Sequence, residues 1–483
     1  MIILGIETSC DETAISILEC SSDPRPTEQS FGQARKSASS PSAFIRVLGN
    51  VLYSQVKIHE QYGGVFPMLA KREHSKNLIP LLKKAMESSS LISNFKFQIS
   101  NEKEEKIKKI LEREEELLEQ FLEFIPTIEK PPIDAIAVTY GPGLEPALWV
   151  GISFAKALSE VWNIPIVPVN HMEGHLIVAL LRNEMSNNKF SRFLNTKIED
   201  PRFCKAKSGQ ISNEKTGTKD KVGEFVIENV EFPLLALLVS GGHTELVLAK
   251  NWGEYEILGQ TKDDAVGEAF DKVARILGLP YPGGPQISRL ADSARTRINT
   301  DKEKLMNTNN ENIRVYPSSN SCKSVFRLPR PMLHSGDYNF SFSGLKTAVL
   351  YLVKKLEEEM QKNDPRKSAI SIRDNPRLQQ EVAREFEDAV VEVLTKKTRT
   401  AIENNGIKSL VLGGGVASNK EIRKSFEKLA EEFDEIKLYI PKGNLSTDNS
   451  IMIAIAGYLD FSTQRQHDKN KILKAEGNLR LSK

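Results

Sequence analysis

Two histidines at helical spacing are the first residues whose types could do chemistry. His171 and His175 lie in the run HMEGH, directly after the apolar segment VPVN. Side chains four residues apart on a helix lie about 5–6 Å apart at Cβ, so both imidazoles could bind one metal ion. The zinc-protease pattern has a glutamate beside the first histidine, whereas Glu173 lies two positions on. This weakens a metalloprotease interpretation, and two histidines at chance spacing are the plainer alternative.

A carboxylate far along the chain could complete such a metal site. Asp448 lies in the run STDN, immediately before an apolar helix predicted over Ser450 to Leu459. A side-chain oxygen of Asp448 or Thr447 could instead cap that helix. Both interpretations stay open at this point.

Three glycine-rich turns favour contact with phosphate. They are VSGGHT at 239–244, PGGP at 282–285 and LGGGVASNK at 412–420. Glycine lets backbone N–H groups approach phosphate oxygens, and a helix N-terminus adds a favourable dipole. Each turn alone is common, but three of them with a hydroxyl-rich N-terminal hairpin are typical of actin-like nucleotide-binding folds.

An acidic run precedes the second glycine turn. In DDAVGEAFDK, residues 263–272, the spacing predicts Asp264, Glu268 and Asp271 near one helical face. These carboxylates could bind ribose hydroxyls or a substrate amine, and a solvated acidic helix face is the alternative.

The elements that must position these residues alternate between apolar β-branched runs and helical stretches. This pattern predicts α/β layers with largely parallel strands. Two segments, LGIETSCDETAISIL and LALLVSGGHTELVLA, each predict a strand, a tight polar turn and a second strand. The repeated hairpin suggests two similar domains that face each other across a cleft. The predicted strands are Ile2 to Ile6, Ile133 to Thr139, Ile164 to Val169, Leu234 to Val239, Ser409 to Leu412 and Ile436 to Ile440.

Polar or charged segments interrupt this pattern and are interpreted as surface insertions. In the segment 88–130, the helical spacing of apolar residues predicts an amphipathic helix that packs on the body of the protein, with partner binding as the alternative. In the segment 183–230, a lysine cluster could contact RNA phosphates, although a solvated loop is the plainer account. The segments are 20–43, 88–130, 183–230, 294–325 and 358–377. The apolar helix residues are Ile107, Ile110, Leu111, Leu117, Leu118, Phe121 and Leu122, and the lysines are Lys205, Lys207, Lys215, Lys219 and Lys221.

Composition narrows the class of protein. The 483 residues, 40% of them hydrophobic, suffice for two or three domains with separate cores. A net charge of only +2 means that nucleic acid binding would need a local basic surface. Four scattered cysteines and the absence of a signal peptide or membrane span predict a protein of the reducing cytoplasm.

These segments, in this order, resemble the tRNA N6-adenosine threonylcarbamoyltransferase family of the bacterial TsaD type, formerly known as O-sialoglycoprotein endopeptidases. The resemblance covers well over half of the chain. It is carried by GIETSCDETAISI, LYSQVKIHEQYGGVFPMLAKREHSKNL, TYGPGLEPALWVG, NHMEGHL, LLVSGGHTELVL, DDAVGEAFDKVARILGLPYPGGP, FSFSGLKTAV, LVLGGGVASNKEIR and STDN.

The resemblance implies a duplicated actin-like α/β fold (the ASKHA fold), with two RNase H-like domains. The first would comprise residues 1–170 and 445–475, the second 232–444, and 183–230 would be a polar inserted linker. His171, His175 and Asp448 would bind one divalent metal, expected to be Fe²⁺ with Zn²⁺ as the alternative. Such a set leaves coordination positions open for substrate. The implied substrate-binding residues are Leu238, Val239, Ser240, Gly241, Gly242, Asp271, Gly284 and Asn419.

The implied reaction transfers threonylcarbamoyl from threonylcarbamoyl-AMP to N6 of adenosine 37, in the anticodon loop of tRNAs that read ANN codons. It forms t6A and releases AMP. TsaB-like and TsaE-like subunits are the implied partners. Two departures from the family pattern, KGNLSTDN before the last motif and Glu145-Pro146 after the GPGL turn, leave the metal ligands intact. An actin-like ATPase or kinase and a metalloprotease are the alternative functions, although kinases of this class hold Mg²⁺ mainly through carboxylates, water and phosphates.

Overall fold

The computed structural model describes residues 1–22, 43–93, 97–183, 223–227, 230–307, 326–363, 371–463 and 473–482. Within these ranges the chain forms two compact units. Unit 1 comprises Met1–His59, Val65–Glu231 and Tyr439–Lys483, and unit 2 comprises Glu60–Gly64 and Phe232–Leu438. Each unit contains one β-sheet with helices packed on it.

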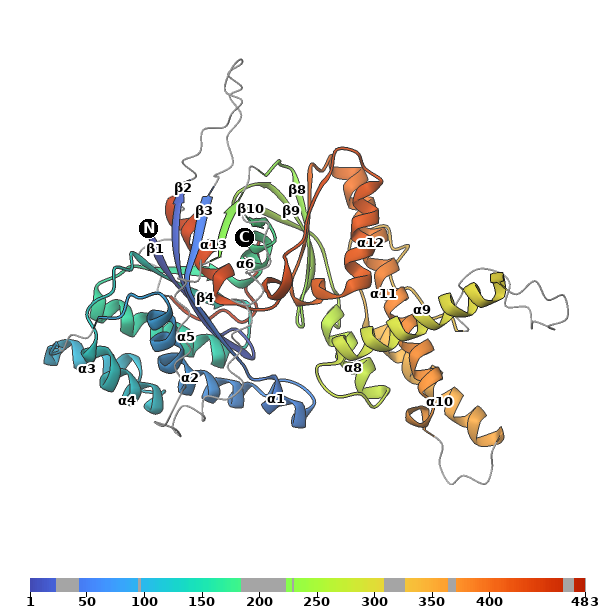
Figure 1. The fold of residues 1–483 in the computed structure, drawn as a ribbon, viewed down its shortest axis with the longest axis horizontal. Helices are drawn as coiled ribbons and strands as arrows, with labels where there is room; N and C mark the ends of the chain where they lie inside the picture. Colours follow the sequence, from blue (N-terminus) through green and yellow to red (C-terminus); the bar gives the residue numbers. More distant parts are fainter. Residues whose placement is uncertain are drawn as a thin grey trace, which may run out of the picture. The chain divides into compact units, whose positions relative to one another are not determined.

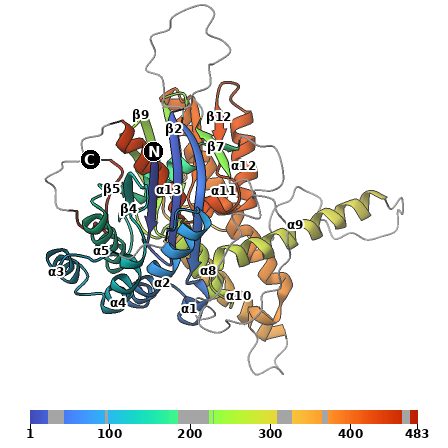
Figure 2. The ribbon, with the colours of Figure 1, turned by 60° about the vertical axis from the view of Figure 1, so that its left-hand side comes forward.

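The sheet of unit 1 has the strand order β5-β4-β1-β2-β3-β7-β6. β1 pairs antiparallel with β2 and parallel with β4, and β4 pairs parallel with β5. Figure 2 shows β2 and β3 as adjacent strands, and they pair antiparallel. The bounds are β1 Ile2–Glu7, β2 Glu12–Ser22, β3 Ala43–Ser54, β4 Ala135–Gly141, β5 Ile166–Asn170, β6 Leu181–Asn183 and β7 Glu224–Ile227.

The alternation of side chains along strand β1 shows which helices lie on each face of the unit 1 sheet. Leu4 and Ile6 belong to an apolar cluster shared with α2 and α5, whereas Gly5 approaches α13 so closely that a Cβ would lie 2.4 Å from the Ser450 oxygen. Since successive residues of a strand face opposite sides, α13 covers one face and α2 and α5 the other (Figure 1). The helices are α1 Val56–His59, α2 Pro67–Ser88, α3 Asn101–Ile110, α4 Glu115–Phe124, α5 Glu145–Trp162, α6 His171–Val178 and α13 Ser450–Ser462.

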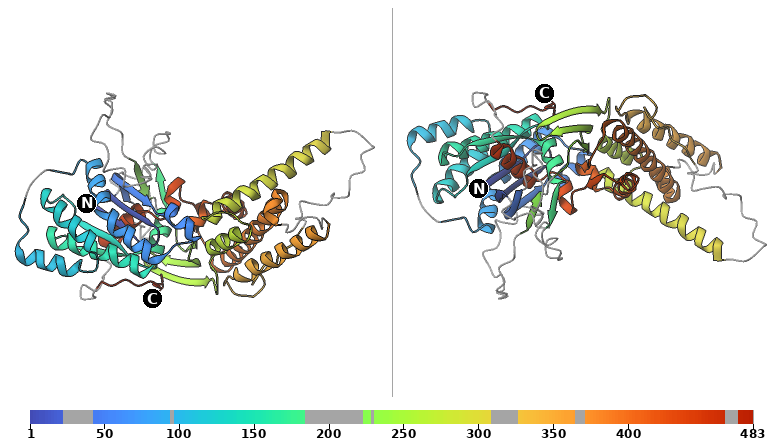
Figure 3. Two further views of the ribbon diagram at one scale, coloured as in Figure 1. Left: turned by 90° about the horizontal axis from the view of Figure 1, so that it is seen from below. Right: turned by 90° about the horizontal axis from the view of Figure 1, so that it is seen from above.

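The sheet of unit 2 has the strand order β10-β9-β8-β11-β12. β8 pairs antiparallel with β9 and parallel with β11. Among its helices, α9 and α11 pack along each other (Figure 3). The bounds are β8 Leu234–Val239, β9 Thr244–Asn251, β10 Glu254–Gln260, β11 Ser409–Gly413, β12 Lys437–Tyr439, α8 Val266–Ile276, α9 Gly283–Asn307, α10 Ser343–Asn363, α11 Pro376–Asn405 and α12 Lys420–Glu431. Short 3₁₀ helices occupy Glu60–Tyr62, Ile125–Thr127, Ile372–Asp374, Gly415–Ser418 and Gly443–Ser446.

The two sheets repeat one pattern, in which an antiparallel three-stranded meander is continued by parallel strands. In unit 1 the pattern is β3-β2-β1-β4-β5, and in unit 2 it is β10-β9-β8-β11-β12. Both predicted hairpins form, with Glu7 opposite Ala14 in one and Val239 opposite Thr244 in the other. This confirms the predicted α/β class and the duplication expected of an actin-like fold. The expectation of largely parallel strands is wrong, because most pairings between the described strands are antiparallel.

Several of the segments predicted as insertions contain regular structure. The single amphipathic helix predicted within 88–130 is wrong, because α3 ends at Ile110 and α4 begins at Glu115. Its apolar residues Ile107, Leu111, Leu117 and Phe121 are nevertheless fully buried, as the packing prediction required. Helices α9, α10 and α11 run into the other charged segments. Strand β7 lies in the predicted linker and pairs with β3. The lysine cluster at 205–221 lies outside the described residues.

Across the part of the chain that the structure describes, no helix combines the length and apolar character needed to cross a membrane.

Candidate functional site

The two histidines lie on one short helix of unit 1. Strand β5 ends at Asn170, whose side-chain oxygen accepts hydrogen bonds from the backbone N–H of Met172 (2.9 Å) and Glu173 (3.3 Å). This cap satisfies donors that the first turn of α6 leaves unpaired. His171 and His175 then follow at helical spacing, and both are buried.

The carboxylate Asp448 reaches the histidines because another residue caps the following helix. The side-chain oxygen of Asn449 accepts the N–H of Met452 at 3.0 Å and so caps α13. The alternative in which Asp448 or Thr447 caps that helix is therefore wrong. Close packing of α13 on β1 at Gly5 holds the start of the helix, and Asp448 precedes it by two residues.

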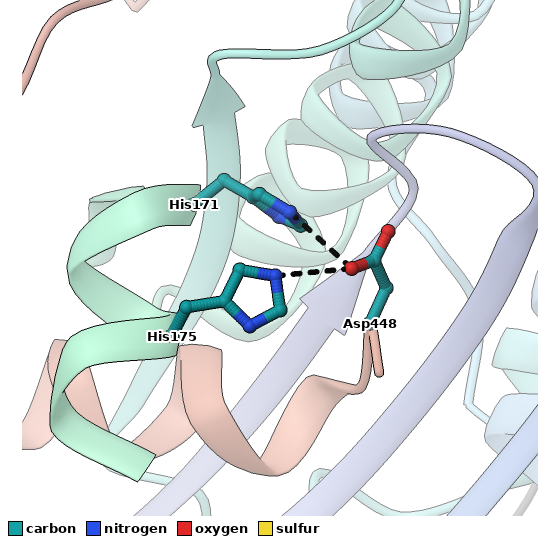
Figure 4. A group of neighbouring side chains, drawn as sticks. All are labelled: His171, His175 and Asp448. Atoms are coloured by element: carbon teal, nitrogen blue, oxygen red, sulfur yellow. Dashed lines mark hydrogen bonds and ion pairs between the residues drawn. The ribbon is translucent and has the colours of Figure 1, made fainter. Parts of the chain in front are cut away.

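The three side chains converge on one point (Figure 4). Oδ1 of Asp448 lies 3.4 Å from Nε2 of His171 and 3.1 Å from Nε2 of His175. The two rings are nearly perpendicular, with centroids 4.7 Å apart. One ligand atom from each residue can be chosen so that all three lie within 4.8 Å of one another. Residues distant in sequence thus present two imidazole nitrogens and a carboxylate to the same volume.

Charges at this cluster perturb its titration. Burial opposes a charge on His171, but Asp448 and Glu7 outweigh it and raise the pKa of His171 to about 10. Burial lowers the pKa of His175, with a further contribution from His171. Despite burial, the two histidines hold the pKa of Asp448 well below its ordinary value. A divalent cation would take the place of the His171 proton as the positive charge near the carboxylates of Asp448 and Glu7.

Glu7 and Ser9 contact Nδ1 of His171, although their positions in the sequence did not single them out. Glu7 is fully buried, and its Oε2 lies 3.1 Å from Nδ1 of His171. The Ser9 hydroxyl lies 3.2 Å from the same nitrogen. A charged residue at the end of the otherwise apolar run Ile2–Glu7 is the signal that could have identified Glu7.

The donor set fits a divalent transition metal. Two imidazole nitrogens and one carboxylate suit iron or zinc and leave coordination positions for substrate. The second nitrogen of His171 already contacts a carboxylate, which is the outer arrangement found around metal-bound histidines. His175 differs in this respect, because among the described residues its buried Nδ1 has no hydrogen-bond partner.

Five of the predicted substrate residues lie at the end of β8 and in the turn between β8 and β9 of unit 2. Leu238 and Val239 are the buried end of β8. The Ser240 N–H donates to the His243 carbonyl at 2.8 Å, and its hydroxyl accepts the His243 N–H at 3.1 Å. Gly241 and Gly242 at the tip are exposed, and a Cβ on either would meet nothing within 4 Å. The Ser240 amide is thus used within the hairpin.

Two further glycines let neighbouring segments approach this turn. A Cβ on Gly267 would lie 2.6 Å from the Ser240 carbonyl oxygen. A Cβ on Gly414 would lie 2.3 Å from the Val239 oxygen, and Gly414 has φ +90°. Both positions therefore exclude side chains, and they bring α8 and the β11 turn against the end of β8.

Asp271 organises the second glycine turn. Its Oδ1 accepts the Gly283 N–H at 2.6 Å, where α9 begins. Burial raises the pKa of Asp271, and the amides of Gly283 and Gly284 oppose that shift. A Cβ on Gly284 would meet nothing within 4 Å.

The other acidic residues of that run are engaged by lysines. The prediction that Asp264 lies on the same helix is wrong, because α8 begins at Val266. Asp264 instead pairs with Lys272 at 2.8 Å and Lys346 at 3.4 Å. Glu268 also pairs with Lys272, at 2.6 Å.

Asn419 has extensive structural contacts. Its oxygen accepts the N–H groups of Glu421 and Ile422, both at 3.0 Å, and so caps α12. Its amide nitrogen donates to Ser288 (2.7 Å) and Glu387 (2.6 Å). The cluster around His171 lies in unit 1, and all eight predicted substrate residues lie in unit 2.

Comparison with known proteins gives one consistent result at the level of sequence. A family model described as TsaD, tRNA N6-adenosine threonylcarbamoyltransferase, matches residues 46–94, 104–189 and 222–455. The protein of that name from Polynucleobacter necessarius subsp. necessarius is 36% identical over 459 residues, which cover 95% of this chain and 92% of the relative. The one from Thermosipho africanus is 36% identical over 458 residues, covering 95% and 94%.

The matches among solved structures are distant in sequence. The ROK hexokinase of Thermus thermophilus is 11% identical, with a TM-score of 0.34 over 96% of this chain and 100% of that one. Component A of (R)-2-hydroxyglutaryl-CoA dehydratase from Acidaminococcus fermentans is 9% identical, with a TM-score of 0.37 and the same two coverages.

Proposed function

We propose that His171, His175 and Asp448 hold a divalent metal ion needed for the transfer of threonylcarbamoyl, since the chain belongs to the tRNA N6-adenosine threonylcarbamoyltransferase family. As a member of this family the protein is a transferase that modifies tRNA and forms t6A. The observation that carries the proposal is the approach of both Nε2 atoms to the single oxygen Oδ1 of Asp448.

The proposed donor is threonylcarbamoyl-AMP, and the proposed acceptor is N6 of adenosine 37 in tRNAs that read ANN codons. The N6 lone pair forms a bond to the carbamoyl carbon, the bond from that carbon to the phosphate oxygen breaks, and AMP leaves. The proton lost from N6 passes to solvent or to the departing phosphate. An anticodon loop can present this base because its nucleotides unstack at low cost.

An exocyclic adenine amine is a weak nucleophile, so the donor carbonyl must be made more electrophilic. A divalent ion, Fe²⁺ or Zn²⁺, would act there as a Lewis acid on the donor's oxygens. The chain's part is to hold that ion with two buried imidazoles and a carboxylate. In unit 2, the exposed amides of Gly241 and Gly242 and the open position at Gly284 support a proposed role in binding the adenylate.

The proposal extends to the setting of the reaction. We place the protein in the cytoplasm, with TsaB-like and TsaE-like subunits as partners. The tRNA substrate of the family supports the cytoplasmic placement, and the two partner subunits are those that the family resemblance implies.

The test is transfer of labelled threonylcarbamoyl from its adenylate to an unmodified ANN-decoding tRNA, with partner subunits added. His171→Ala should lose bound metal and transfer together. The matched control is His334→Ala, which removes an exposed histidine of unit 2. A tRNA with guanosine at position 37 should accept no label. Full transfer by metal-free His171→Ala protein would refute the metal's role, and label on the guanosine-37 tRNA would refute the proposed acceptor.

A further inference from the structure

The buried carboxylate of Glu7 is an acceptor that three donors approach. Its Oε1 accepts the backbone N–H of Ser9 at 2.5 Å. Its Oε2 accepts the Thr139 hydroxyl at 2.6 Å and lies 3.1 Å from Nδ1 of His171. The Ser9 backbone N–H can only donate, so it occupies Oε1, and Oε2 faces the Thr139 hydroxyl and the His171 ring, where a carboxylate oxygen accepts hydrogen bonds.

The proton position on His171 follows from this arrangement. Because Glu7 can only accept, Nδ1 of His171 must carry a hydrogen. The Ser9 hydroxyl, 3.2 Å from Nδ1, can share that hydrogen as a second acceptor. In the neutral ring the lone pair then lies on Nε2, the atom that faces Asp448.

We propose that Glu7 is the positioning residue that holds His171 in the Nδ1–H form, so that Nε2 is the metal-binding atom. This inference rests on the metal centre proposed above. Glu7 is contributed by the end of β1 and His171 by the start of α6, so the contact links the first hairpin to the metal helix. His175 has no described partner on its Nδ1, which makes His171 the ligand whose orientation depends on an outer contact.

Substitution of Glu7 by glutamine provides a sharp test, because the local donors allow only one orientation of the amide. Its oxygen must face the Ser9 backbone N–H, which cannot reverse its polarity. Its NH₂ group then faces Thr139 and His171. The Thr139 hydroxyl can rotate and accept, but His171 must also accept, which moves the ring hydrogen to Nε2. Glu7→Gln therefore keeps the shape of the side chain and blocks the metal-binding nitrogen.

The first measurement is titration of the full-length metal-free protein with Co²⁺, followed by its visible absorption. Glu7→Gln should weaken Co²⁺ binding by about 10–100-fold, the effect typical of losing an outer partner of a metal-bound histidine. Thr139→Val is the matched control, because it removes a hydrogen bond to the same Glu7 oxygen without presenting a donor to His171. It should change the affinity by no more than about threefold.

Ser9→Ala separates the two acceptors near Nδ1. If Glu7 sets the ring's orientation, Ser9→Ala should resemble Thr139→Val. A loss in Ser9→Ala equal to that in Glu7→Gln would assign the role to the hydroxyl and overturn the inference. Equal Co²⁺ affinity in Glu7→Gln and wild type would also overturn it, whereas failure of the wild type to bind Co²⁺ or Zn²⁺ would instead refute the metal centre.

A second measurement does not require the Glu7→Gln variant to fold. In the Zn²⁺-loaded wild type, ¹⁵N spectra of the histidine side chains should show a protonated Nδ1 and a metal-bound Nε2 for His171. The resonances are assigned from the signals lost in His171→Asn and His175→Asn. A metal-bound Nδ1 or a protonated Nε2 on His171 would contradict the assignment of Glu7.

Discussion

The turn that follows β1 and the turn that follows β8 occupy equivalent places in the five-strand pattern that the two sheets share, but they present different chemistry. At the end of the first strand, unit 1 has the carboxylate Glu7 and unit 2 has the apolar Val239. In the unit 1 turn Thr8 and Ser9 are buried, and the Ser9 side chain contacts His171. The tip of the unit 2 turn consists of the exposed glycines Gly241 and Gly242. The two sheets thus share one scaffold, but the unit 1 turn makes its contacts through side chains, whereas the unit 2 turn exposes its backbone.

The largest expected effect comes from removing the carboxylate of the unit 1 cluster. Asp448→Ala should weaken metal binding by more than the roughly 100-fold that loss of an outer partner can cause, and transfer should fall with it. Folding should change little, because Asn449 caps α13. Metal content by mass spectrometry and the transfer assay measure this, with the exposed Asp434→Ala as control. Retained metal in Asp448→Ala would remove this residue from the site.

In unit 2 the largest effect should be on stability. Gly414→Ala would force a Cβ to 2.3 Å from the Val239 oxygen at a φ of +90°. We expect a loss of about 3 kcal/mol or more in the free energy of unfolding, from strain and displacement of β8. Urea denaturation measures it, and Gly415→Ala next to it, where a Cβ meets nothing within 4 Å, is the control. Equal stability of the two variants would show that β8 and the β11 turn do not pack as described.

The unit 1 turn should also be sensitive to acid. His74 donates through Nε2 to the Cys10 carbonyl (2.9 Å), and its Nδ1 contacts the Thr13 hydroxyl (2.7 Å). Burial lowers the pKa of His74 to about 4 from an ordinary value of 6.5. The unfolded chain therefore binds this proton at a higher pH than the folded chain does, so the contribution to stability is complete above about pH 6.5 and is lost as the pH falls toward 4.

This loss should amount to about 2–3 kcal/mol between pH 6.5 and 4. The measurement is the pH dependence of urea unfolding for metal-free wild type and His74→Gln, because the difference between them removes the contribution of the other titrating groups. Identical slopes would mean that His74 does not stay neutral in the fold. His334→Gln, at an exposed position, is the control and should follow the wild type.

A smaller effect would sharpen the role of the glycine turns. Alanine fits at Gly284 without contact, so Gly284→Ala should leave the free energy of unfolding within about 0.5 kcal/mol of wild type. If adenylate binds there, transfer should fall about tenfold through a higher KM for the donor, because the methyl group would occupy the ligand's space. Gly344→Ala, where a Cβ would meet only Pro331 at 3.7 Å, is the control. Unchanged KM in Gly284→Ala would exclude that turn from the donor site.

Local chemistry made much of the fold predictable. The apolar runs Ile2 to Ile6 and Leu234 to Val239 both form strands, and they are continuous because residues on both faces of each strand are buried. The charged segments were harder to interpret. The α3–α4 break could not be read from helical spacing, since Leu111 continues the apolar pattern and is buried while the helix ends before it.

The candidate site divides in the same way. The spacing of His171 and His175 follows from helical geometry, and the sequence by itself determined that they share a helix face. It could not determine that Asn449, rather than Asp448, caps α13, because neighbouring residues of an STDN run are all competent caps. Helix α13 packs against β1 at Gly5, and its Gly457 packs against Ala137 of β4. Only this packing decided where Asp448 would lie.

Glu7 shows what only the tertiary structure decided. Sequence placed this residue at the end of a strand, 164 positions from His171, and no local rule connects the two. The parallel order β1-β4-β5 brings the ends of these strands to one edge of the sheet, and α6 starts there directly after β5. Spacing along the chain therefore determined which residues share an element, whereas strand order and close helix packing determined which elements meet.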